Sequence, residues 1–208
     1  MHKEKIEALQ AALAKDLLGW PAQKIMSPLD TDKYLASNKD SKRAAVAVLL
    51  YPNSEGYIHM LYIKRPAHPL DKHSGQISFA GGQQEEEDES FQETALREMH
   101  EELGIDPKVV TILGPLSSIY VYVSDFYVEP YVMYMDAPPT LVLQESEVAF
   151  TIDVPLRQLL EQASLKTTIA IRGTELPNVP YYDLNGDVLW GATAMITSEL
   201  LEIIKKLG

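Results

Sequence analysis

Cysteine is absent from this chain of 208 residues. The absence excludes disulfides, cysteine-bound zinc, iron–sulfur clusters and thiol nucleophiles, and it fits a reducing compartment. No apolar run reaches the roughly 18 residues that a membrane-spanning helix needs. The first residues also lack the pattern of a secretory signal. We therefore expect a cytoplasmic protein that does not use a membrane.

Positive charge is scarce, since 18 Lys+Arg stand against 30 Asp+Glu and give a formal net charge of −12. A surface this acidic repels nucleic-acid backbones, which argues against a general DNA or RNA binder. A small anionic substrate remains compatible with this charge. Its site would need basic side chains or bound metal to hold phosphate.

The chain has the composition of an ordinary globular protein, with 46% hydrophobic and 23% charged residues. Its length favours one well-filled domain. Ile6, Leu9, Leu13 and Leu17 recur at three- and four-residue steps, which predicts an amphipathic helix over residues 4–18. Docking on the domain surface or at a subunit contact is favoured for this helix over a membrane-surface role.

An irregular lead-in is expected over residues 21–40, so residues 1–40 would precede a main domain over residues 41–208. Apolar and β-branched stretches predict strands over residues 44–51, 57–64, 109–118 and 126–135, with weaker signals over 166–171 and 179–184. Helices are predicted over residues 90–105, 155–162 and 191–207. This mixture indicates an α/β or α+β sandwich, in which helices cover a central mixed sheet.

The helix expected after residue 90 has clear signals at both ends. Ser90 with Glu93 forms a capping-box start, while Gly104 and then Pro107 mark the end. A glycine turn at Gly81-Gly82 and an acidic stretch over residues 85–89 precede it. The predicted helix is therefore well defined in the sequence.

Three carboxylates of this helix, Glu98, Glu101 and Glu102, border its apolar face and converge because they are spaced i, i+3 and i+4. Like charges at this spacing destabilise a helix by a few tenths of a kcal/mol per pair, roughly. Arg97 can relieve part of the repulsion. A hard divalent cation can relieve more, because Mg²⁺ and Mn²⁺ prefer carboxylate oxygens. The residues alone leave both a metal site and a solvated acidic face open.

A resemblance to a known family begins at these residues. The glycine pair, the acidic stretch and the segment Arg97-Glu98-Met99-His100-Glu101-Glu102-Leu103-Gly104-Ile105 resemble the Nudix box. The second half of the box matches at every fixed position, whereas the glycines stand at least one residue early. The coenzyme A pyrophosphatase subgroup of this family has a similarly displaced box.

Other segments also resemble that subgroup, and the resemblance runs from about residue 44 to the last residue. They are residues 61–65, 73–82, 94–96, 124–132, 147–148 and 190–194. Three features depart from the subgroup: Ala80 replaces a proline, the loop over residues 65–73 is one residue longer, and Asp71-Lys72 replaces a pair that includes arginine.

The resemblance implies a Nudix α/β/α sandwich with a central mixed sheet, Mg²⁺ or Mn²⁺ as cofactor, and hydrolysis of a diphosphate in a nucleoside diphosphate derivative. Glu98 and Glu102 would bind the metal, Glu101 would share metal or water contacts, and Arg97 would orient the glutamates. Glu147 is a candidate further ligand or base, and a surface glutamate is the competing interpretation.

Candidates for contacts to substrate phosphate lie in and before the glycine turn: Lys64, Arg65, His73, Gly81 and Gly82. For the basic residues among them, simple solvation is the competing interpretation. Coenzyme A or acyl-coenzyme A is the substrate favoured by the resemblance, and ADP-ribose, dinucleotides and nucleoside triphosphates are alternatives. A nucleotide-sensing module without catalysis and a purely structural domain are alternatives of other classes. The resemblance also makes a homodimer plausible.

Overall fold

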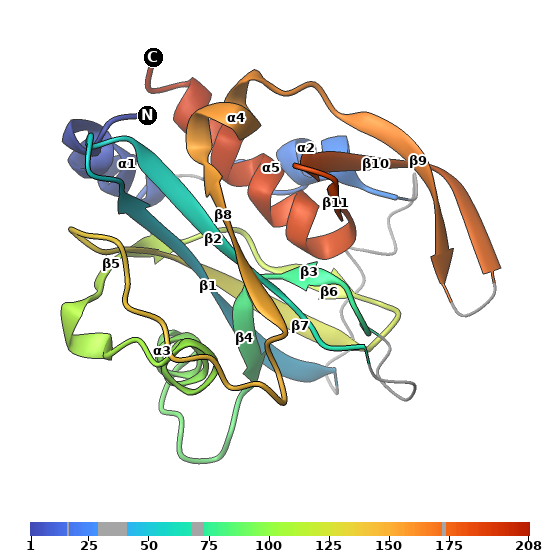
Figure 1. The fold of residues 1–208 in the computed structure, drawn as a ribbon, viewed down its shortest axis with the longest axis horizontal. Coiled ribbons are helices and arrows are strands. Elements are labelled where there is room, and N and C mark those ends of the chain that lie inside the picture. Colours follow the sequence, from blue (N-terminus) through green and yellow to red (C-terminus); the bar gives the residue numbers. More distant parts are fainter. Residues whose placement is uncertain (16, 29–40, 68–72, 172–173) are drawn as a thin grey trace.

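The structure, a computed structural model, describes residues 1–15, 17–28, 41–67, 73–171 and 174–208. Eight strands of the described part form one sheet, with the order β3-β2-β1-β7-β5 and with β4, β6 and β8 paired to β1, β7 and β2 (Figure 1). Their bounds are β1 Lys42–Pro52, β2 Ile58–Lys64, β3 Ile77–Ser78, β4 Ala80–Gln83, β5 Thr111–Pro115, β6 Ile119–Val121, β7 Phe126–Tyr134 and β8 Phe150–Pro155. Because β1 runs parallel to β7 and antiparallel to β2 and β4, the sheet is mixed, as predicted.

Helices cover both faces of this sheet (Figure 1). Helix α3 (Phe91–Leu103) lies on one face, and α5 (Gly191–Lys205), α1 (Ile6–Leu13) and α4 (Leu156–Glu161) lie on the other. Successive residues of a strand point to opposite faces. Accordingly, Leu49 belongs to the core under α3 and Leu50 to the core under α5. This arrangement is the predicted α/β/α sandwich.

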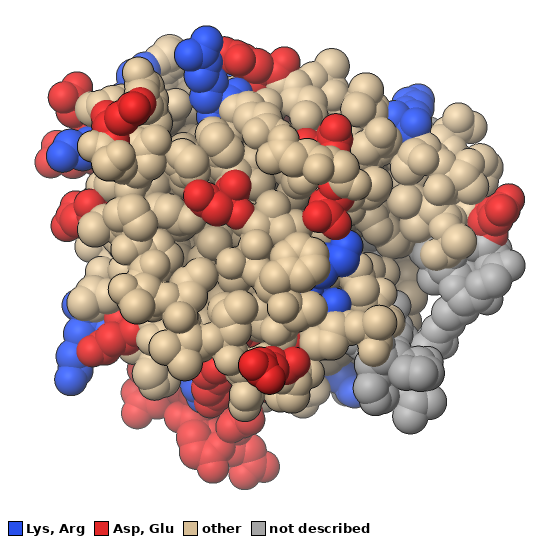
Figure 2. Space-filling view, in the orientation of Figure 1, with Lys and Arg blue, Asp and Glu red and all other residues tan. Residues whose placement is uncertain are grey.

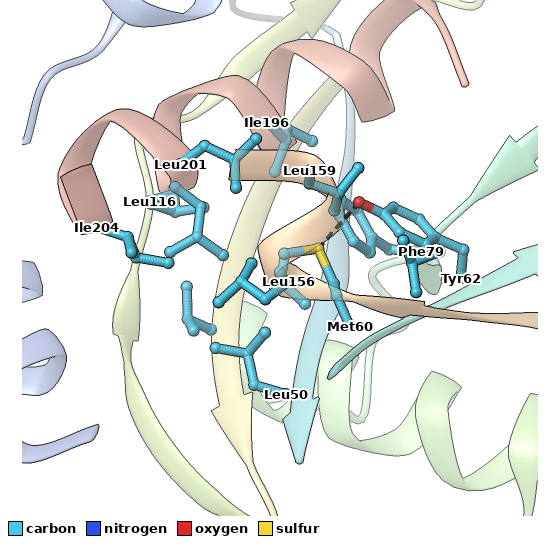
Figure 3. Packing of buried hydrophobic residues seen from close by; sticks show 14 of the residues in the cluster. Leu50, Met60, Tyr62, Phe79, Leu116, Leu156, Leu159, Ile196, Leu201 and Ile204 are labelled. Carbon is cyan, nitrogen blue, oxygen red and sulfur yellow. Dashed lines mark hydrogen bonds between the residues drawn. The ribbon is translucent and has the colours of Figure 1, made fainter. Parts of the chain in front are cut away.

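The core under α5 is the larger one, and Figure 3 shows it from close by. Leu50 of β1, Met60 of β2 and Leu156 of α4 lie in this core together with Leu201 of α5. The hydroxyl of buried Tyr62 donates to Met60 Sδ at 3.0 Å and lies 3.0 Å from Thr197 Oγ1. Burial raises the pKa of this phenol, so Tyr62 stays neutral and acts as a packing residue with one satisfied polar end.

The first residues differ from the single helix predicted over residues 4–18. They form a 3₁₀ turn, η1 (Lys3–Lys5), and α1, which ends at Leu13; α2 (Trp20–Gln23) and a second 3₁₀ turn, η2 (Lys24–Met26), then follow. Gly19 has a φ of 56°, which turns the chain between α1 and α2. The predicted irregular lead-in over residues 21–40 is wrong at residues 21–26, which belong to α2 and η2, because Pro21 occupies the first turn of a short helix. Residues 29–40 of the lead-in lie outside the described residues.

A buried carboxylate attaches this amino-terminal segment to α5. Glu199 is fully buried and accepts hydrogen bonds from Gly19 N at 2.7 Å, Gln23 Nε2 at 3.0 Å and Ser117 Oγ at 2.6 Å. The predicted apolar stripe also contributes, because Ile6, Leu9 and Leu13 are buried in the α5 core. The segment therefore packs as part of the same core, while the division at residue 41 stays a prediction.

The last part of the chain forms a smaller sheet of order β11-β10-β9. Its strands are β9 (Leu165–Ile171), β10 (Thr174–Leu184) and β11 (Asp187–Leu189), so both weak strand signals are confirmed. The strand predicted over residues 109–118 shortens to β5, because residues 107–109 form a 3₁₀ turn, η4 (Pro107–Val109), led by Pro107. In the described residues, no helix combines the length and apolar character that crossing a bilayer requires.

Candidate active site

Helix α3 begins and ends where the sequence predicts. Ser90 Oγ accepts from Glu93 N at 3.2 Å, and Gly104 adopts the left-handed conformation with φ 71° at the C-cap. The Glu93 side chain reaches back to Glu89 N at 2.8 Å, one residue before the position that a standard capping box uses. Ala95 and Met99 are fully buried against the sheet. The helix is thereby fixed in the rotation that turns Glu98 and Glu102 toward Gly82 and Gly81 of β4.

The glycine pair was predicted to form a turn, and this prediction is wrong. Both glycines are part of strand β4. Gly81 pairs with Val46 and Gly82 with Ala45 of β1. The absence of side chains lets α3 approach closely: Gly81 N donates to Glu102 Oε2 at 3.0 Å, and a Cβ on Gly82 would stand 2.4 Å from Glu98 Oε1. Glycine is required here for a strand that carboxylates contact directly.

Three carboxylates meet at this point: Glu98, Glu102 and Glu147 each offer an oxygen, and the three oxygens lie within 4.8 Å of one another. Glu147 arrives from a distant segment, which is attached to the end of α3 by Gln144 N donating to Glu102 O at 3.0 Å. Val148, the next residue, is buried in the α3 core. We call Glu98, Glu102 and Glu147 the acidic trio.

Burial dominates the electrostatics of Glu98 and Glu102. It raises the pKa of Glu102 to about 8; the Gly81 N–H opposes the shift, while the charges of Glu98 and Glu147 add to it. Burial also raises the pKa of Glu98, against the pull of the Arg97 guanidinium. A cation that joins Glu98 and Glu102 would favour the charged form of both carboxylates.

The trio fits a hard divalent cation on three observations. Glu102 Oε1 is buried and has no hydrogen-bond partner within the part of the chain that the structure describes. All three candidate ligand atoms are carboxylate oxygens, the ligand type that Mg²⁺ and Mn²⁺ prefer. The lack of a side chain at Gly82 leaves room for the Glu98 carboxylate, because a Cβ there would stand 2.4 Å from Glu98 Oε1.

Arg97 is held by Asp88, a carboxylate that was not among the predicted site residues. Its Nε and Nη2 donate to Asp88 Oδ1 and Oδ2 at 3.0 and 2.9 Å, a two-pronged ion pair with a carboxylate only 5% exposed. The hydrogen bonds from Arg97 lower the pKa of Asp88 to about 2. Arg97 Nη1 then reaches Glu98 Oε1 at 2.9 Å. Asp88 thus positions Arg97, and Arg97 positions Glu98.

The acidic stretch before α3 offered one signal for this role, because Asp88 is its single aspartate among glutamates. Figure 2 shows acidic side chains gathered along the lower edge of the molecule, over the loop that enters α3. Glu85, Glu86, Glu87 and Glu89 of that loop are exposed, whereas Asp88 turns inward. Its short side chain suits the bidentate pairing.

Glu101 lies apart from the trio. Its carboxylate is 54% exposed and accepts from Arg97 Nη1 at 3.0 Å, so it joins the arginine network. Its predicted sharing of metal or water contacts stays a prediction. The structure brings together Glu98, Glu102 and Glu147 instead.

A cavity of about 370 Å³ opens on the other side of β4 from α3. Arg65, His73, Gly81 and Gly82 line it, so four of the five candidates for substrate contact share one cavity. The fifth, Lys64, pairs with Asp187 Oδ1 at 2.9 Å and is not among the lining residues. The loop between Arg65 and His73 falls largely on residues 68–72, including Asp71-Lys72, which lie outside the described residues.

Comparisons with known proteins agree with the geometry. The family model described as NUDIX domain matches residues 41–166. Two curated relatives, each named "Uncharacterized Nudix hydrolase NudL", are 31% identical over 162 residues, 78% of this chain and 79% of theirs. They come from Yersinia pestis (strain Pestoides F) and Yersinia pseudotuberculosis serotype O:1b (strain IP 31758).

Solved structures share the fold at low sequence identity. A Nudix hydrolase from M. smegmatis, RenU, superposes with a TM-score of 0.56 at 16% identity, covering 81% of this chain and 88% of its own. A MutT/nudix family protein from Enterococcus faecalis gives a TM-score of 0.53 at 15% identity, covering 98% of this chain and 74% of its own.

Proposed function

The chain belongs to the Nudix family of pyrophosphohydrolases, and we propose that its substrate is coenzyme A or an acyl-coenzyme A, which it splits at the diphosphate. The products would be adenosine 3′,5′-bisphosphate and 4′-phosphopantetheine or its acyl form. One observation carries this proposal. Segments that resemble the coenzyme A pyrophosphatase subgroup, distant in sequence, line one cavity next to the acidic trio: Arg65, residues 76–79, Gly81-Gly82 and residues 190–193.

The cavity and the trio share the β4 glycines, which supports binding and cleavage at adjacent places. Gly81 lines the cavity and donates its N–H to Glu102. Arg65 also lines the cavity, and its charge acts on the Glu102 carboxylate. A diphosphate at this strand would therefore meet a guanidinium on the cavity side and the acidic trio on the α3 side.

In the proposed reaction, Glu98 and Glu102 would hold a divalent metal, which would supply charge neutralisation for the diphosphate and a more acidic water. The oxygen of water bonds to phosphorus, the bridging P–O bond breaks, and the bridging oxygen leaves on the other phosphate. Glu147 is exposed at the edge of the trio, where it either completes the metal ligands or accepts the proton of the attacking water. Arg97, anchored by Asp88, keeps the Glu98 carboxylate in place.

The test is product analysis by chromatography after incubation with coenzyme A, an acyl-coenzyme A, ADP-ribose and NADH, with Mg²⁺ and with EDTA. We expect coenzyme A or its acyl ester to be cut fastest, and only with metal. Faster cleavage of ADP-ribose or NADH would replace the proposed substrate with one of the alternatives.

The matched variants are Glu98→Gln and Glu102→Gln, which keep side-chain shape and remove charge. We expect both to fold, as judged by thermal denaturation, and to lose metal-dependent turnover. Near wild-type turnover in either variant would remove the metal-site assignment. A sensing module without catalysis would bind nucleotide and release no product in any of these reactions.

Oligomeric state and cell compartment follow from the same proposal only as predictions. A homodimer is expected, and its measurement is sedimentation of the whole chain. A cytoplasmic location is expected from the lack of cysteine.

A further inference from the structure

The interior of the cavity is nearly free of charge. Apart from Arg65 and His73, its described lining carries no charged or titratable side chain except the phenol of Tyr122. These two basic residues belong to one rim, because Arg65 N donates to Gln76 O at 3.0 Å and His73 Nδ1 lies 3.1 Å from Gln76 Oε1. Beyond this rim the walls are largely apolar, with Val46, Phe126, Val128, Leu176, Trp190 and Ile196 among them.

The cavity also offers polar groups suited to amides. The first turn of α5, residues 191–193, lines it, and Trp190 at the N-cap provides no side-chain hydrogen bond to that turn. The first N–H groups of a helix have no partner within the helix. Ser78 Oγ, on the same lining, is buried and has no hydrogen-bond partner among the residues that the structure describes.

We propose that this cavity receives the pantetheine arm of the substrate, with its thiol or thioester end, and leaves the adenosine 3′,5′-bisphosphate half outside. The inference rests on the proposed function and goes beyond it, because it assigns each half of the substrate to a side of β4. It also makes Val128, Phe126 and the start of α5 specificity-determining elements.

Charge selects between the two halves. The nucleotide half carries a 3′-phosphate, and burying such a charge without paired cations is costly. The pantetheine arm is neutral: two amides, a hydroxyl, a gem-dimethyl group and sulfur. Its amides match the helix N–H groups and the Ser78 hydroxyl, and its apolar carbons match the valine and aromatic walls.

Size points the same way. A cavity of about 370 Å³ is near the lower end of the roughly 300–1,000 Å³ found for ligand pockets. It therefore suits one half of coenzyme A. The diphosphate would then lie across Gly81 and Gly82, with the nucleotide on the solvent side of the trio.

The test uses a substitution that narrows the cavity, and it measures inhibition of the enzyme by each of the two products separately. Val128→Phe places an aromatic ring on the β7 wall of the cavity. Val109→Phe makes the same change at an exposed position outside the cavity lining. We expect Val128→Phe to weaken inhibition by 4′-phosphopantetheine about tenfold or more, the equivalent of about 1.4 kcal/mol, and to leave inhibition by adenosine 3′,5′-bisphosphate unchanged. Val109→Phe should change neither.

A second readout uses the substrate itself. Since the 3′-phosphate lies outside the cavity, dephospho-coenzyme A should be cut with a kcat/KM close to that of coenzyme A. If Val128→Phe fails to fold, Ala192→Leu narrows the cavity from the first turn of α5 and serves as the second variant. Thermal denaturation shows whether each variant is folded, and only a folded variant is used in the inhibition measurements.

Three outcomes overturn the inference while the proposed function stands: weakened inhibition by the nucleotide alone, no change for either product, or strong discrimination against dephospho-coenzyme A. If the wild type does not cut coenzyme A at all, the proposed substrate fails instead. Binding of pantetheine alone, without phosphate or metal, is then measured by ligand-observed NMR. Loss of that binding in Val128→Phe supports the cavity assignment, and its absence in the wild type overturns it.

Discussion

Replacing Gly82 by alanine tests how closely the β4 glycines and the α3 carboxylates must fit. The new Cβ would stand 2.4 Å from Glu98 Oε1, whereas ordinary contact begins at 3.4 Å, so the carboxylate must retreat by about 1 Å, the difference 3.4 − 2.4. Glu98 is a flexible side chain and can move. It then no longer stands where the trio needs it.

The expected effect is on turnover and not on folding. A misplacement of about 1 Å at a catalytic group costs about 10²-fold in rate, or about 2.7 kcal/mol of transition-state stabilisation. Stability should stay the same or rise slightly, because alanine in an extended strand restricts the unfolded chain. The assay is kcat/KM for coenzyme A at saturating Mg²⁺, together with thermal denaturation of the same preparation.

Gly81→Ala is the matched control, and it should lower the stability of the fold, whereas Gly82→Ala should lower turnover. Its Cβ would lie 2.3 Å from the backbone oxygen of Ala45, and its φ of 156° strains any side chain. The pairing of β4 with β1 must therefore shift, and the melting temperature should fall. Wild-type turnover in folded Gly82→Ala, or unfolding of Gly82→Ala beside a stable Gly81→Ala, would refute the reasoning.

Three further predictions concern the carboxylates. Glu147→Gln should reduce metal-dependent turnover more than Glu101→Gln, because only Glu147 joins Glu98 and Glu102; the reverse order of kcat values would place Glu101 at the metal. Asp88→Asn should lower the free energy of unfolding by about 1.5–3 kcal/mol at pH 7, since it removes a buried charged partner of Arg97. The Asp88 pKa falls from 3.8 to about 2 on folding, so this contribution to stability is present above pH 4 and is lost as the pH falls through about 2. In urea denaturation, the difference in unfolding free energy between wild type and variant should therefore be smaller near pH 2 than at pH 7. A difference that stays constant would contradict the ion pair. The Glu102 pKa rises from 4.5 to about 8 in the metal-free protein, so metal must displace a proton, and Mn²⁺ affinity by calorimetry should increase up to about tenfold per pH unit between pH 6 and 8. Affinity that does not depend on pH would show that Glu102 is already ionised.

Elements with strong local signals could be predicted from the sequence. Helix α3 has both of its caps in the chain itself, at Ser90 and Gly104, and its apolar face recurs with the helical period. Strands β1, β2 and β7 are long and apolar, and their bounds agree with the prediction to within a few residues. Spacing alone brought Glu98 and Glu102 to one side of the helix.

Features that depend on distant contacts could not be predicted. Gly81 and Gly82 have the sequence of a turn, and only pairing with β1 and the approach of Glu98 explain their place in a strand. Glu147 joins the trio from a segment more than forty residues away, through the bond from Gln144 to the end of α3. Asp88 differs from its acidic neighbours only in its contact with Arg97. In each case tertiary packing decides what local propensity leaves open.

The most direct test of the central claim is a Mn²⁺ titration followed by electron paramagnetic resonance, with coenzyme A hydrolysis measured in the same samples. Wild-type protein should bind Mn²⁺ and gain turnover in proportion to the bound metal, and Glu102→Gln should lose both together. Turnover without bound metal, or equal Mn²⁺ binding by folded Glu102→Gln, would contradict the acidic trio as the centre of the reaction.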